Sequence, residues 1–552
     1  MKKSPSQILQ EISLMLEILG DNPFRARAFA RASRIVADFE GDMESVLKRE
    51  ELRRQKGIGE KIWAELNSIF QKGFSPLHRQ LQKEIPSEIF LLLQLPGLGP
   101  SKVRQLFLSG ITNLEQLKEA CRDGSLLSQR GFGKRTVERI LEEIDFWESN
   151  RGKWHLPQAQ IWRLEWEERL RGWGQEYYVV GEFRRGQEWI TSLEFLVLVD
   201  DFQSLWQRLQ TEEGIVAERR GEVHIQILNS PIPIHFYLTD KKSLGAGLAY
   251  YTGSSAHLQK LQDYLLSHQF KLTPRGLIGP CGVVEVPQED IFFEKVHLPW
   301  IPPELREGLE ELEWAKEGKL PELVSYEDIE VILHNHTDWS DGKFSIEEMS
   351  LEAHRRGFRG ISINDHSASA VYAGGLSPER VERQLLELQA LSHLPIRIFS
   401  GIECDIRKDG SLDLEADLLA RLEVVIAAVH SHFQLSMEQQ TRRICRAISH
   451  SNVDILAHPT GRLLLRRRGY EVDWVEIFQA CCRYGVAIEL NANPYRLELD
   501  WRLIQAAKKA GVRFAIGCDA HHVEDFGHVS WALMLARKGG LERGDIVNYG
   551  WV

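Results

Sequence analysis

The stretch "IEVILHNH", residues 329–336, is a short apolar run that ends on two histidines. Six similar runs follow: "GISINDH" (360–366), "RIFSGIE" (397–403), "VVIAAVH" (424–430), "VDILAH" (453–458), "VAIELNAN" (486–493) and "RFAIGCDAH" (513–521). Segments with helical apolar spacing, such as "SIEEMSLEAHRRG", separate them. Strands and helices that alternate seven times predict a parallel sheet closed into a barrel over residues 329–552.

Six of these strands end in side chains that bind metal ions, and only "VAIELNAN" does not. The carboxyl ends of barrel strands share one rim, so side chains that are distant in sequence converge there. A single histidine would more often be structural, but repeated placement at strand ends has no comparable structural explanation. We therefore predict a metal centre built from His334, His336, Asp341, His366, Glu403, His430, His458, Asp519 and His521.

Mixed nitrogen and oxygen ligands suit Mn²⁺, Zn²⁺ or Fe²⁺ better than Mg²⁺, and we expect Mn²⁺ first. Clustered cations lower the pKa of water, which produces hydroxide that can attack phosphorus near neutral pH. Arg462, in "HPTGRLLLRRRGY", is predicted to neutralise a phosphate oxygen. The three arginines at 466–468 either steer a nucleic-acid backbone or form a solvated cluster. The predicted catalytic residues are His334, His336, Glu403, Asp519 and Arg462.

The length of 552 residues is too great for a single core and predicts several domains. A hydrophobic content of 43% and a charged content of 27% are typical of a globular protein. We find no apolar run long enough for a membrane span and no signal peptide after "MKKSPSQILQ", so we expect a cytoplasmic protein without membrane contact. Seven cysteines without a CxxC pair argue against a disulfide framework or a cysteine zinc site.

The net charge of −11 is unevenly distributed, because the first 150 residues are weakly basic and the rest is acidic. The basic part repeats one pattern three times, in "RQKGIGEKIWAEL" (53–65), "QLPGLGPSKVRQL" (94–106) and "SQRGFGKRTVERI" (128–140). Each copy reads as a helix, a Gly-apolar-Gly turn and a second helix that starts with a cationic residue. Glycines leave no side chain in the way, so backbone N–H groups at the helix start can approach a phosphate.

This pattern indicates a helix-hairpin-helix, which grips the DNA backbone without reading sequence. One such turn would be better explained by a glycine-capped corner between helices, but three favour DNA. Lys56 can join the predicted contacts. The predicted DNA-binding residues are Gly57, Gly59, Lys61, Gly97, Gly99, Lys102, Gly131, Gly133 and Lys134.

Residues 175–240 are rich in β-branched and aromatic residues, and turn residues divide them into strands. The predicted strands are "EYYVVGEF", "LEFLVLVD", "EVHIQIL" and "IPIHFYL". The segment "AYYTGSSAH" (249–257) then predicts a turn leading into a helix.

The order of three glycine hairpins, "GEFRRG" (181–186), a strand pair and "YYTGS" resembles the family-X DNA polymerases. The segment "LPWIPPELREG" (298–308) and all that follows resemble the bacterial branch with a C-terminal PHP phosphoesterase domain. The resemblance implies a PHP barrel that holds up to three divalent metal ions, and all nine of its ligand positions are filled here. One departure is Ile332, where the family usually has an aspartate, and we expect altered support for the metals there.

The polymerase pattern GSxRRGxExxxDxD identifies a degenerate site, because none of its three metal-binding aspartates is present. The pattern places Gly181 and Arg185 as expected, but its two aspartates fall on Ser192 and Glu194 and the third falls on His235. Two Mg²⁺ ions need several anionic oxygens, so we predict that polymerisation is lost. Glu182 adds a negative charge where a triphosphate would rest, whereas Arg184 and Arg185 can still contact backbone phosphates. The alternative is that Asp200 or Asp201 replaces the lost ligands.

The resemblance implies a multidomain protein of α+β and α/β class, which we expect to be a monomer. Its predicted parts are an N-terminal helix-hairpin-helix domain (1–85), a fingers-like one (86–150), a degenerate palm (151–240), a thumb-like domain (241–312), a linker (313–328) and a distorted (β/α)7 PHP barrel (329–552). The implied function is processing of DNA 3′ ends in repair by a 3′–5′ exonuclease, with 3′-phosphatase or abasic-site endonuclease activity as options. The alternatives are an active family-X repair polymerase, a small-molecule phosphatase of the histidinol-phosphate type, and a non-catalytic DNA scaffold.

Overall fold

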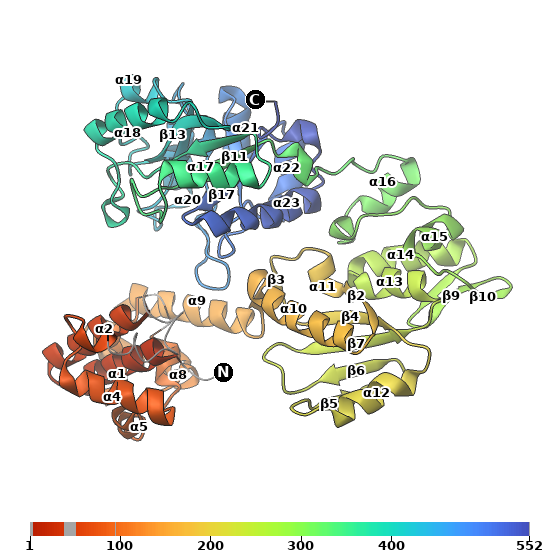
Figure 1. The fold of residues 1–552 in the computed structure, drawn as a ribbon, viewed down its shortest axis with the longest axis horizontal. Helices are drawn as coiled ribbons and strands as arrows, with labels where there is room; N and C mark the ends of the chain where they lie inside the picture. The colour runs from red at the N-terminus through yellow and green to blue at the C-terminus, as the bar shows by residue number, and fades with distance from the viewer. Residues whose placement is uncertain (1–3, 38–50, 94, 96, 551–552) are drawn as a thin grey trace. The chain divides into compact units, whose positions relative to one another are not determined.

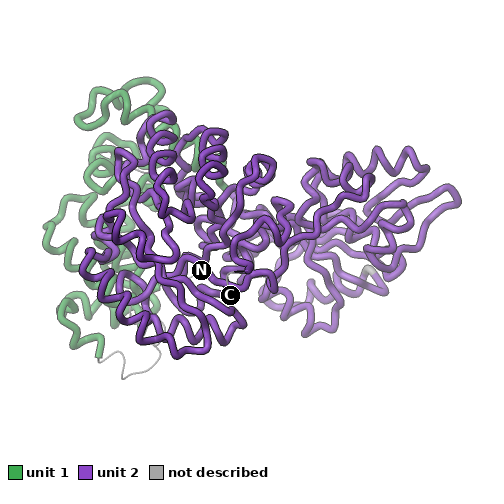
Figure 2. The backbone as a smooth tube through the Cα atoms, turned by 90° about the horizontal axis from the view of Figure 1, so that it is seen from above, with its two compact units in different colours: residues 1–151 green, residues 152–552 purple. Residues whose placement is uncertain are grey.

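The computed structural model describes residues 4–37, 51–93, 95 and 97–550. The chain divides into two compact units, residues 1–151 and residues 152–552 (Figure 2). Among the described residues, no helix is both long and apolar enough to cross a membrane. The finer domain boundaries expected from the sequence stay predictions.

The first unit is built from helices that pack around one continuous apolar core, from Ile8 to Ile144. Its first helix begins after a capping box in which Ser4 accepts a hydrogen bond from the Gln7 backbone, and it ends at Gly20 in a left-handed conformation. The α-helices are α1 (Pro5–Leu19), α2 (Pro23–Ala37), α4 (Glu60–Lys72), α5 (Pro76–Leu81), α6 (Ile89–Leu92), α7 (Pro100–Leu108), α8 (Leu114–Arg122) and α9 (Lys134–Asn150) (Figure 1).

Each Gly-apolar-Gly segment forms the turn in front of a helix. The first glycine of each is left-handed, with φ of 125° at Gly57, 85° at Gly97 and 89° at Gly131. The second glycine is the extended N-cap of α4, α7 or α9 and has no side-chain hydrogen bond to the helix. The N–H groups of each first turn therefore point outward, as phosphate binding requires. The expectation of a cationic first residue was wrong for two of the helices, because α4 begins with Glu60 and α7 with Pro100.

The second unit begins with a five-stranded sheet in the order β2-β4-β7-β6-β5, which contains the four strands expected from the sequence. Strands β4 and β7 are parallel neighbours, and their register sets Glu194 beside His235. A short pair, β1 (Trp154–His155) with β3 (Trp189–Ile190), lies outside this sheet. The sheet and its helices are β2 (Glu176–Val180), β4 (Leu193–Leu198), β5 (Ala217–Arg219), β6 (His224–Ile227), β7 (Ile234–Thr239), α10 (Leu156–Gly172), α11 (Gly181–Arg184) and α12 (Phe202–Thr211).

The segment after this sheet has its own apolar core, which includes the buried side chains of Phe292 and Phe293. Arg306 is fully buried there, and its guanidinium donates to Glu289 Oε1 (2.7 Å) and to the Ile301 carbonyl. The elements are α13 (Leu244–Thr252), α14 (Ser255–Ser267), β8 (Lys271–Thr273), β9 (Gly276–Gly279), β10 (Gly282–Val284), α15 (Glu289–Lys295) and α16 (Glu311–Glu317).

The rest of the unit is a closed barrel of seven parallel strands in sequence order, as the strand and helix pattern predicted. The strands are β11 (Val331–Asn335), β12 (Gly360–Ile363), β13 (Arg397–Asp405), β14 (Val424–Ala428), β15 (Ile455–Leu456), β16 (Ala487–Asn491) and β17 (Phe514–Ala520). The α-helices are α17 (Ile346–Arg355), α18 (Pro378–Ala390), α19 (Ala416–Leu419), α20 (Met437–Ile448), α21 (Trp474–Tyr484), α22 (Trp501–Lys509) and α23 (Val529–Lys538).

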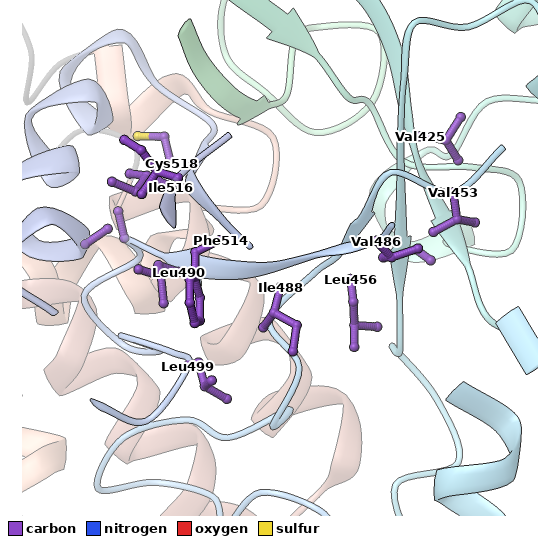
Figure 3. Close-up of a cluster of buried hydrophobic side chains, with 14 of the residues drawn as sticks. Val425, Val453, Leu456, Val486, Ile488, Leu490, Leu499, Phe514, Ile516 and Cys518 are labelled. Carbon is purple, nitrogen blue, oxygen red and sulfur yellow. The ribbon is translucent and has the colours of Figure 1, made fainter. Parts of the chain in front are cut away.

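Alternate residues of a barrel strand pack into two different apolar clusters, because neighbouring side chains point to opposite faces of a strand. Val331 and Leu333 belong to a small inner cluster with residues such as Ile426. The residue between them, Ile332, belongs to a large cluster that includes helix residues. Figure 3 shows part of that cluster, including Phe514 from β17. This alternation fixes which strand residues can reach the barrel interior.

The loop that follows α11 is anchored on barrel helices within the second unit. Lys538 of α23 is fully buried, and its ammonium group donates to the Arg185 carbonyl (3.0 Å) and to Glu307 Oε1 (2.5 Å). Glu188 accepts hydrogen bonds from Trp501 Nε1 (3.1 Å) and from Arg502 (2.9 Å), both on α22. The five-stranded sheet is therefore joined to the barrel by buried polar contacts.

Replacement of Gly245 by alanine is expected to destabilise this unit by about 1–3 kcal/mol, because an added Cβ meets backbone that cannot easily move. That Cβ would lie 2.0 Å from the Gln288 carbonyl oxygen and 2.8 Å from that of Val286. The thermal unfolding midpoint followed by circular dichroism measures the effect. Gly172→Ala is the matched control, since nothing lies within 4 Å of its Cβ position in α10. Equal midpoints for the two variants would contradict the packing described for Gly245.

Candidate metal centre

All nine predicted ligands lie at the rim formed by the carboxyl ends of the barrel strands. His334 is in β11, Glu403 is in β13 and Asp519 is in β17, while the others directly follow a strand or lie in the loop after β11. His336 Nε2 is 3.5 Å from Asp519 Oδ1, and His366 Nδ1 is 2.7 Å from Glu403 Oε2. Barrel closure therefore brings together residues that are almost 190 positions apart in sequence.

Three groups at this rim have donor atoms that all lie within 4.8 Å of one another. His336 belongs to two of the groups and His366 to two, so the three groups form one connected cluster. His458 stands beside them, with its Nε2 atom 2.8 Å from Glu403 Oε1. The groups are His336, Asp341, His366 and His521; His334, His336 and Asp519; and His366, Glu403 and His430. Among the described residues, no such group lies outside the barrel.

Several buried polar atoms of the cluster have no hydrogen-bond partner in the described protein and are available to a metal ion. Both ring nitrogens of His336 are buried and, within the described part of the chain, have no hydrogen-bond partner. The same holds for His334 Nε2 and His458 Nδ1. A buried polar atom without a partner costs about 1–3 kcal/mol, and a cation would satisfy these atoms together. The residues present therefore fit divalent metal ions.

The backbone is left-handed at three of the nine residues, with φ of 60° at His334, 26° at His458 and 53° at Asp519. Residues other than glycine pay about 1 kcal/mol or more for such a conformation, and they cluster at functional sites. His334 and Ile332 are two positions apart, so regular alternation would place His334 on the outer face of the barrel. The left-handed turn and an irregular register between Ile332 and Asn335 bring its side chain to the rim instead.

Two carboxylates that sequence reasoning missed orient histidines of the cluster. Glu489 in β16 lies 2.5 Å from His334 Nδ1 and also accepts from the His458 backbone N–H (2.6 Å). Asp405, two residues after Glu403, lies 2.8 Å from His430 Nδ1. A carboxylate on Nδ1 leaves Nε2 available as a ligand. The available signal was an acidic residue inside an apolar strand.

The charges of the cluster hold its acids ionised and its outer histidines protonated. Burial opposes ionisation of Glu403, but the neighbouring charges of His430, His366 and His334 keep its pKa well below the usual range. Burial would lower the pKa of His430, yet Glu403 and Asp405 raise it to about 10. Likewise, Asp341 and Asp519 outweigh burial and raise the pKa of His521 to about 9. The cluster thus carries protons in places that cations can take.

His336, at the centre of the cluster, has a lowered rather than a raised pKa. Burial, followed by the charges of His521 and His366, lowers the pKa of His336 to about 3. Its ring is therefore neutral near pH 7, as a metal ligand must be.

Arg462, which was predicted to neutralise a phosphate oxygen, is engaged by protein acceptors. Its guanidinium donates to Asp500 Oδ2 (2.8 Å) and to the backbone carbonyls of Arg496 (3.0 Å) and Leu497, so its donors serve the loop that precedes α22. Arg496 is better placed, because its Nε atom lies 3.6 Å from Asp519 Oδ2 and its side chain is 17% exposed. No periodic pattern distinguishes the two arginines, since both lie in irregular loops.

The side chains at the three substituted positions of the five-stranded sheet form hydrogen bonds with one another or with a neighbour. Ser192 donates to Glu194 Oε1 (3.0 Å), and burial raises the pKa of Glu194. His235 Nδ1 lies 2.9 Å from His224 Nε2, and burial, then the charge of His224, lowers the pKa of His235 to about 4. A Cβ on Gly181 would lie 2.6 Å from the Glu194 carboxylate, so the glycine allows this close approach. Few anionic oxygens remain here for a metal pair.

The neighbouring acids are engaged in local structure. Glu182 accepts hydrogen bonds from the Thr191 backbone (2.6 Å) and hydroxyl (2.9 Å). Asp201 caps α12 by accepting from the Gln203 backbone (3.0 Å), and Asp200 is exposed. This geometry favours a solvated turn for the two aspartates rather than a replacement metal site.

The two arginines of "GEFRRG" bind protein groups rather than facing a phosphate. Arg184 pairs with Glu289 (2.6 Å) and donates to Thr252 Oγ1 (2.6 Å). Arg185 is 8% exposed, pairs with Glu307 (3.0 Å) and donates to the Thr252 carbonyl (2.5 Å). Arg185 is thus largely buried and engaged by protein groups, and its contact with backbone phosphates stays a prediction.

At the glycine turns, Lys56, Lys61 and Lys134 are exposed. Lys102 differs, because its ammonium group donates to the Gly97 carbonyl of its own turn (3.0 Å). Gly59, Gly99 and Gly133 have open space where a Cβ would be, so a ligand can reach the backbone at each turn.

Four family profiles match the chain in the order that the folds suggest. A Helix-hairpin-helix domain matches residues 2–74, and a SAM-like Helix-hairpin-helix tandem matches residues 89–145. A DNA polymerase beta thumb matches residues 247–307, and a PHP domain matches residues 333–493. Fold and site together define a protein that joins polymerase-like domains to a PHP barrel.

The relatives identify the family. The DNA polymerase/3′-5′ exonuclease PolX of Bacillus subtilis (strain 168) is 32% identical over 99% of this chain and 97% of its own length. Probable phosphatases of Thermoanaerobacter sp. (strain X514) and Caldicellulosiruptor bescii are 30% and 32% identical, but they cover 39% and 36% of this chain and 88% and 82% of their own lengths. The chain belongs to the bacterial family-X DNA polymerases that carry a PHP domain.

Metal binding is expected to release protons and to weaken as the pH falls, because cations displace protons from histidines such as His430 and His521. Calorimetric titration with Mn²⁺ at pH 7, in two buffers of different ionisation enthalpy, should detect release of about one proton or more per chain. His521→Asn should release fewer protons than wild type, whereas the exposed His393→Ala should match it. Affinity that does not change between pH 6 and pH 8 would contradict this description.

Proposed function

We propose that the protein hydrolyses phosphodiester bonds at DNA 3′ ends, with the barrel rim as its active site. The observation that carries the proposal is the connected set of three donor groups, which contains buried ring nitrogens without partners in the described structure. The full-length relative named as a 3′-5′ exonuclease supports DNA ends as the substrate. Removal of a 3′-phosphate or cleavage at an abasic site would use the same phosphoester chemistry.

Divalent cations are the proposed cofactors, up to three in number and Mn²⁺ in identity. Imidazole and carboxylate ligands together favour Mn²⁺, Zn²⁺ or Fe²⁺ over Mg²⁺. Such cations would supply activation of water and stabilisation of the leaving oxygen. The proposed ligands are the nine rim residues, with His334, His336, Glu403 and Asp519 at the centre.

The chain's own residues orient this site and recognise the phosphate. Glu489 and Asp405 accept from the Nδ1 atoms of His334 and His430, which directs the Nε2 atoms toward the cluster. Arg496 takes the role first expected of Arg462 and donates to a non-bridging phosphate oxygen. The outer arginine Arg466 stacks on Tyr495 at 4.4 Å and is a candidate for backbone steering.

We further propose that the polymerase-like site does not add nucleotides. Ser192 brings no charge, His235 is neutral near pH 7, and burial disfavours ionisation of Glu194. Arg185 is held by Glu307 at 3.0 Å, so it offers little to a triphosphate. These features support a structural role for the palm-like sheet, through its shape and its contacts, rather than nucleotide addition.

The glycine turns of the first unit are proposed to hold the DNA backbone independently of sequence. Their exposed lysines and open first-turn N–H groups suit phosphates. A small-molecule phosphatase is the second candidate, because the probable phosphatases match 36–39% of the chain. The hairpin turns favour DNA over a small molecule.

His336→Ala is expected to lower 3′-end hydrolysis by at least about 100-fold, because it removes a ligand shared by two donor groups. Release of the terminal nucleotide from a 3′-labelled duplex in Mn²⁺ measures this loss, with His393→Ala as the unaffected control. Primer extension on a gapped template should remain undetectable in wild type and in His336→Ala. Robust extension that survives the substitution would overturn the account of the palm, and equal hydrolysis would overturn that of the rim.

Lys61→Ala and Lys134→Ala are each expected to weaken binding to gapped duplex DNA without changing sequence preference. Each lost phosphate contact should reduce the slope of log affinity against log salt by about 0.9. Fluorescence anisotropy over a salt series measures the slope. The exposed Lys83, which lies outside the turns, gives the control Lys83→Ala. Slopes that match wild type for both test variants would remove the turns from the DNA interface.

A further inference from the structure

A cavity of about 490 Å³ opens beside the metal centre, and two parts of the second unit line it. Asp519 and His521 form part of its lining, so the cavity is continuous with the cluster of donor groups. Its volume lies within the usual range for small-ligand sites, which is about 300–1,000 Å³. The lining includes His155, Gln158, Ile161, Tyr495, Asp519 and His521.

One wall of the cavity comes from the polymerase-like part of the chain, at the start of α10. His155 is held there because β1 pairs with β3, which sets His155 opposite Trp189. The next backbone N–H, of Leu156, donates to the Glu188 carbonyl (3.4 Å). The Glu188 side chain in turn accepts from Trp501 of α22 (3.1 Å). This wall is thus fixed to the barrel by hydrogen bonds on both sides of Glu188.

The chemistry of the walls suits a flat heteroaromatic ring. Tyr495 supplies an aromatic ring, which is 41% exposed and meets His155 edge-on at 5.3 Å between centroids. Ile161 supplies an apolar side chain that is 67% exposed, so its surface is free to pack against a ring. Gln158 is exposed and offers an amide that can both donate and accept at the edge of a base.

His155 has a ring nitrogen that can form a further hydrogen bond. It is 5% exposed, and its buried Nδ1 atom has no partner among the described residues. Burial, then the charge of Arg466, lowers the pKa of His155 to about 4, so the ring is neutral near pH 7. A neutral imidazole can donate or accept, which matches the mixed edges of nucleobases.

We propose that this cavity is the subsite for the base and sugar of the terminal nucleotide. In that arrangement the phosphate of the nucleotide lies at the metal cluster, while Tyr495 and Ile161 flank the base and Gln158 contacts its edge. The polymerase-like part of the chain then contributes specificity to hydrolysis in the barrel. The inference rests on the proposed 3′-end hydrolysis and deepens it.

The test compares two duplexes that differ only in the 3′-terminal nucleotide, which either carries its base or is an abasic tetrahydrofuran analogue. Wild-type protein with Mn²⁺ should hydrolyse the base-bearing end with the higher kcat/KM. The double variant Gln158→Ala, Ile161→Ser should reduce that preference by about five- to tenfold, mainly through KM, because contacts with the base are lost.

Leu164→Ser is the matched control, since Leu164 lies one turn further along α10, is 47% exposed and is not part of the cavity lining. It should keep the wild-type preference. A second readout is inhibition by thymidine 5′-monophosphate, whose Ki should rise by a similar factor in the double variant, while inhibition by inorganic phosphate stays the same.

The outcomes separate the two proposals. A wild type without preference, or a double variant that keeps the preference and the Ki, would overturn the subsite and leave 3′-end hydrolysis standing. A wild type that does not hydrolyse either DNA end would overturn the proposed function, and the subsite with it.

Discussion

The carboxylate of Glu403 is the group on which the arrangement of the rim depends. It is buried, and its oxygens lie 2.7–3.8 Å from nitrogens of five histidines. A buried carboxylate is costly unless charges or donors surround it. The histidines are His334, His336, His366, His430 and His458, which come from four different strand ends. These strands flank β13 on both sides, so their carboxyl ends meet around Glu403 at one rim of the barrel.

Much of this centre was readable from sequence, because strand period and strand-end position determine the rim of a barrel. The seven strands were predicted, eight of the nine candidate ligands lie in the three donor groups, and the ninth, His458, lies beside Glu403. Orientation was not readable, since alternation alone would turn His334 outward and the left-handed backbone reverses it. Glu489 was missed because it lies inside an apolar strand. The choice between Arg462 and Arg496 depends on contacts between two irregular loops, which no periodic pattern encodes.

The contacts of the polymerase-like part of the chain indicate a structural role. The sequence shows Ser192, Glu194 and His235 in place of the family's three aspartates. It does not show which groups the two arginines contact. Arg185 shares the Glu307 carboxylate with Lys538 of the barrel, at 3.0 Å and 2.5 Å. A residue type expected at a triphosphate thus helps to attach the palm-like sheet to the barrel. This attachment also places His155 and α10 beside the metal cluster.

We propose that metal-dependent chemistry resides in the barrel and not in the palm-like sheet. Anomalous diffraction at the manganese absorption edge, from crystals of the full chain grown with Mn²⁺, tests it most directly. We expect anomalous peaks among the nine rim residues, beside Glu403 and His336, and none beside Ser192, Glu194 and His235. A peak at those three positions, with none at the rim, would contradict it.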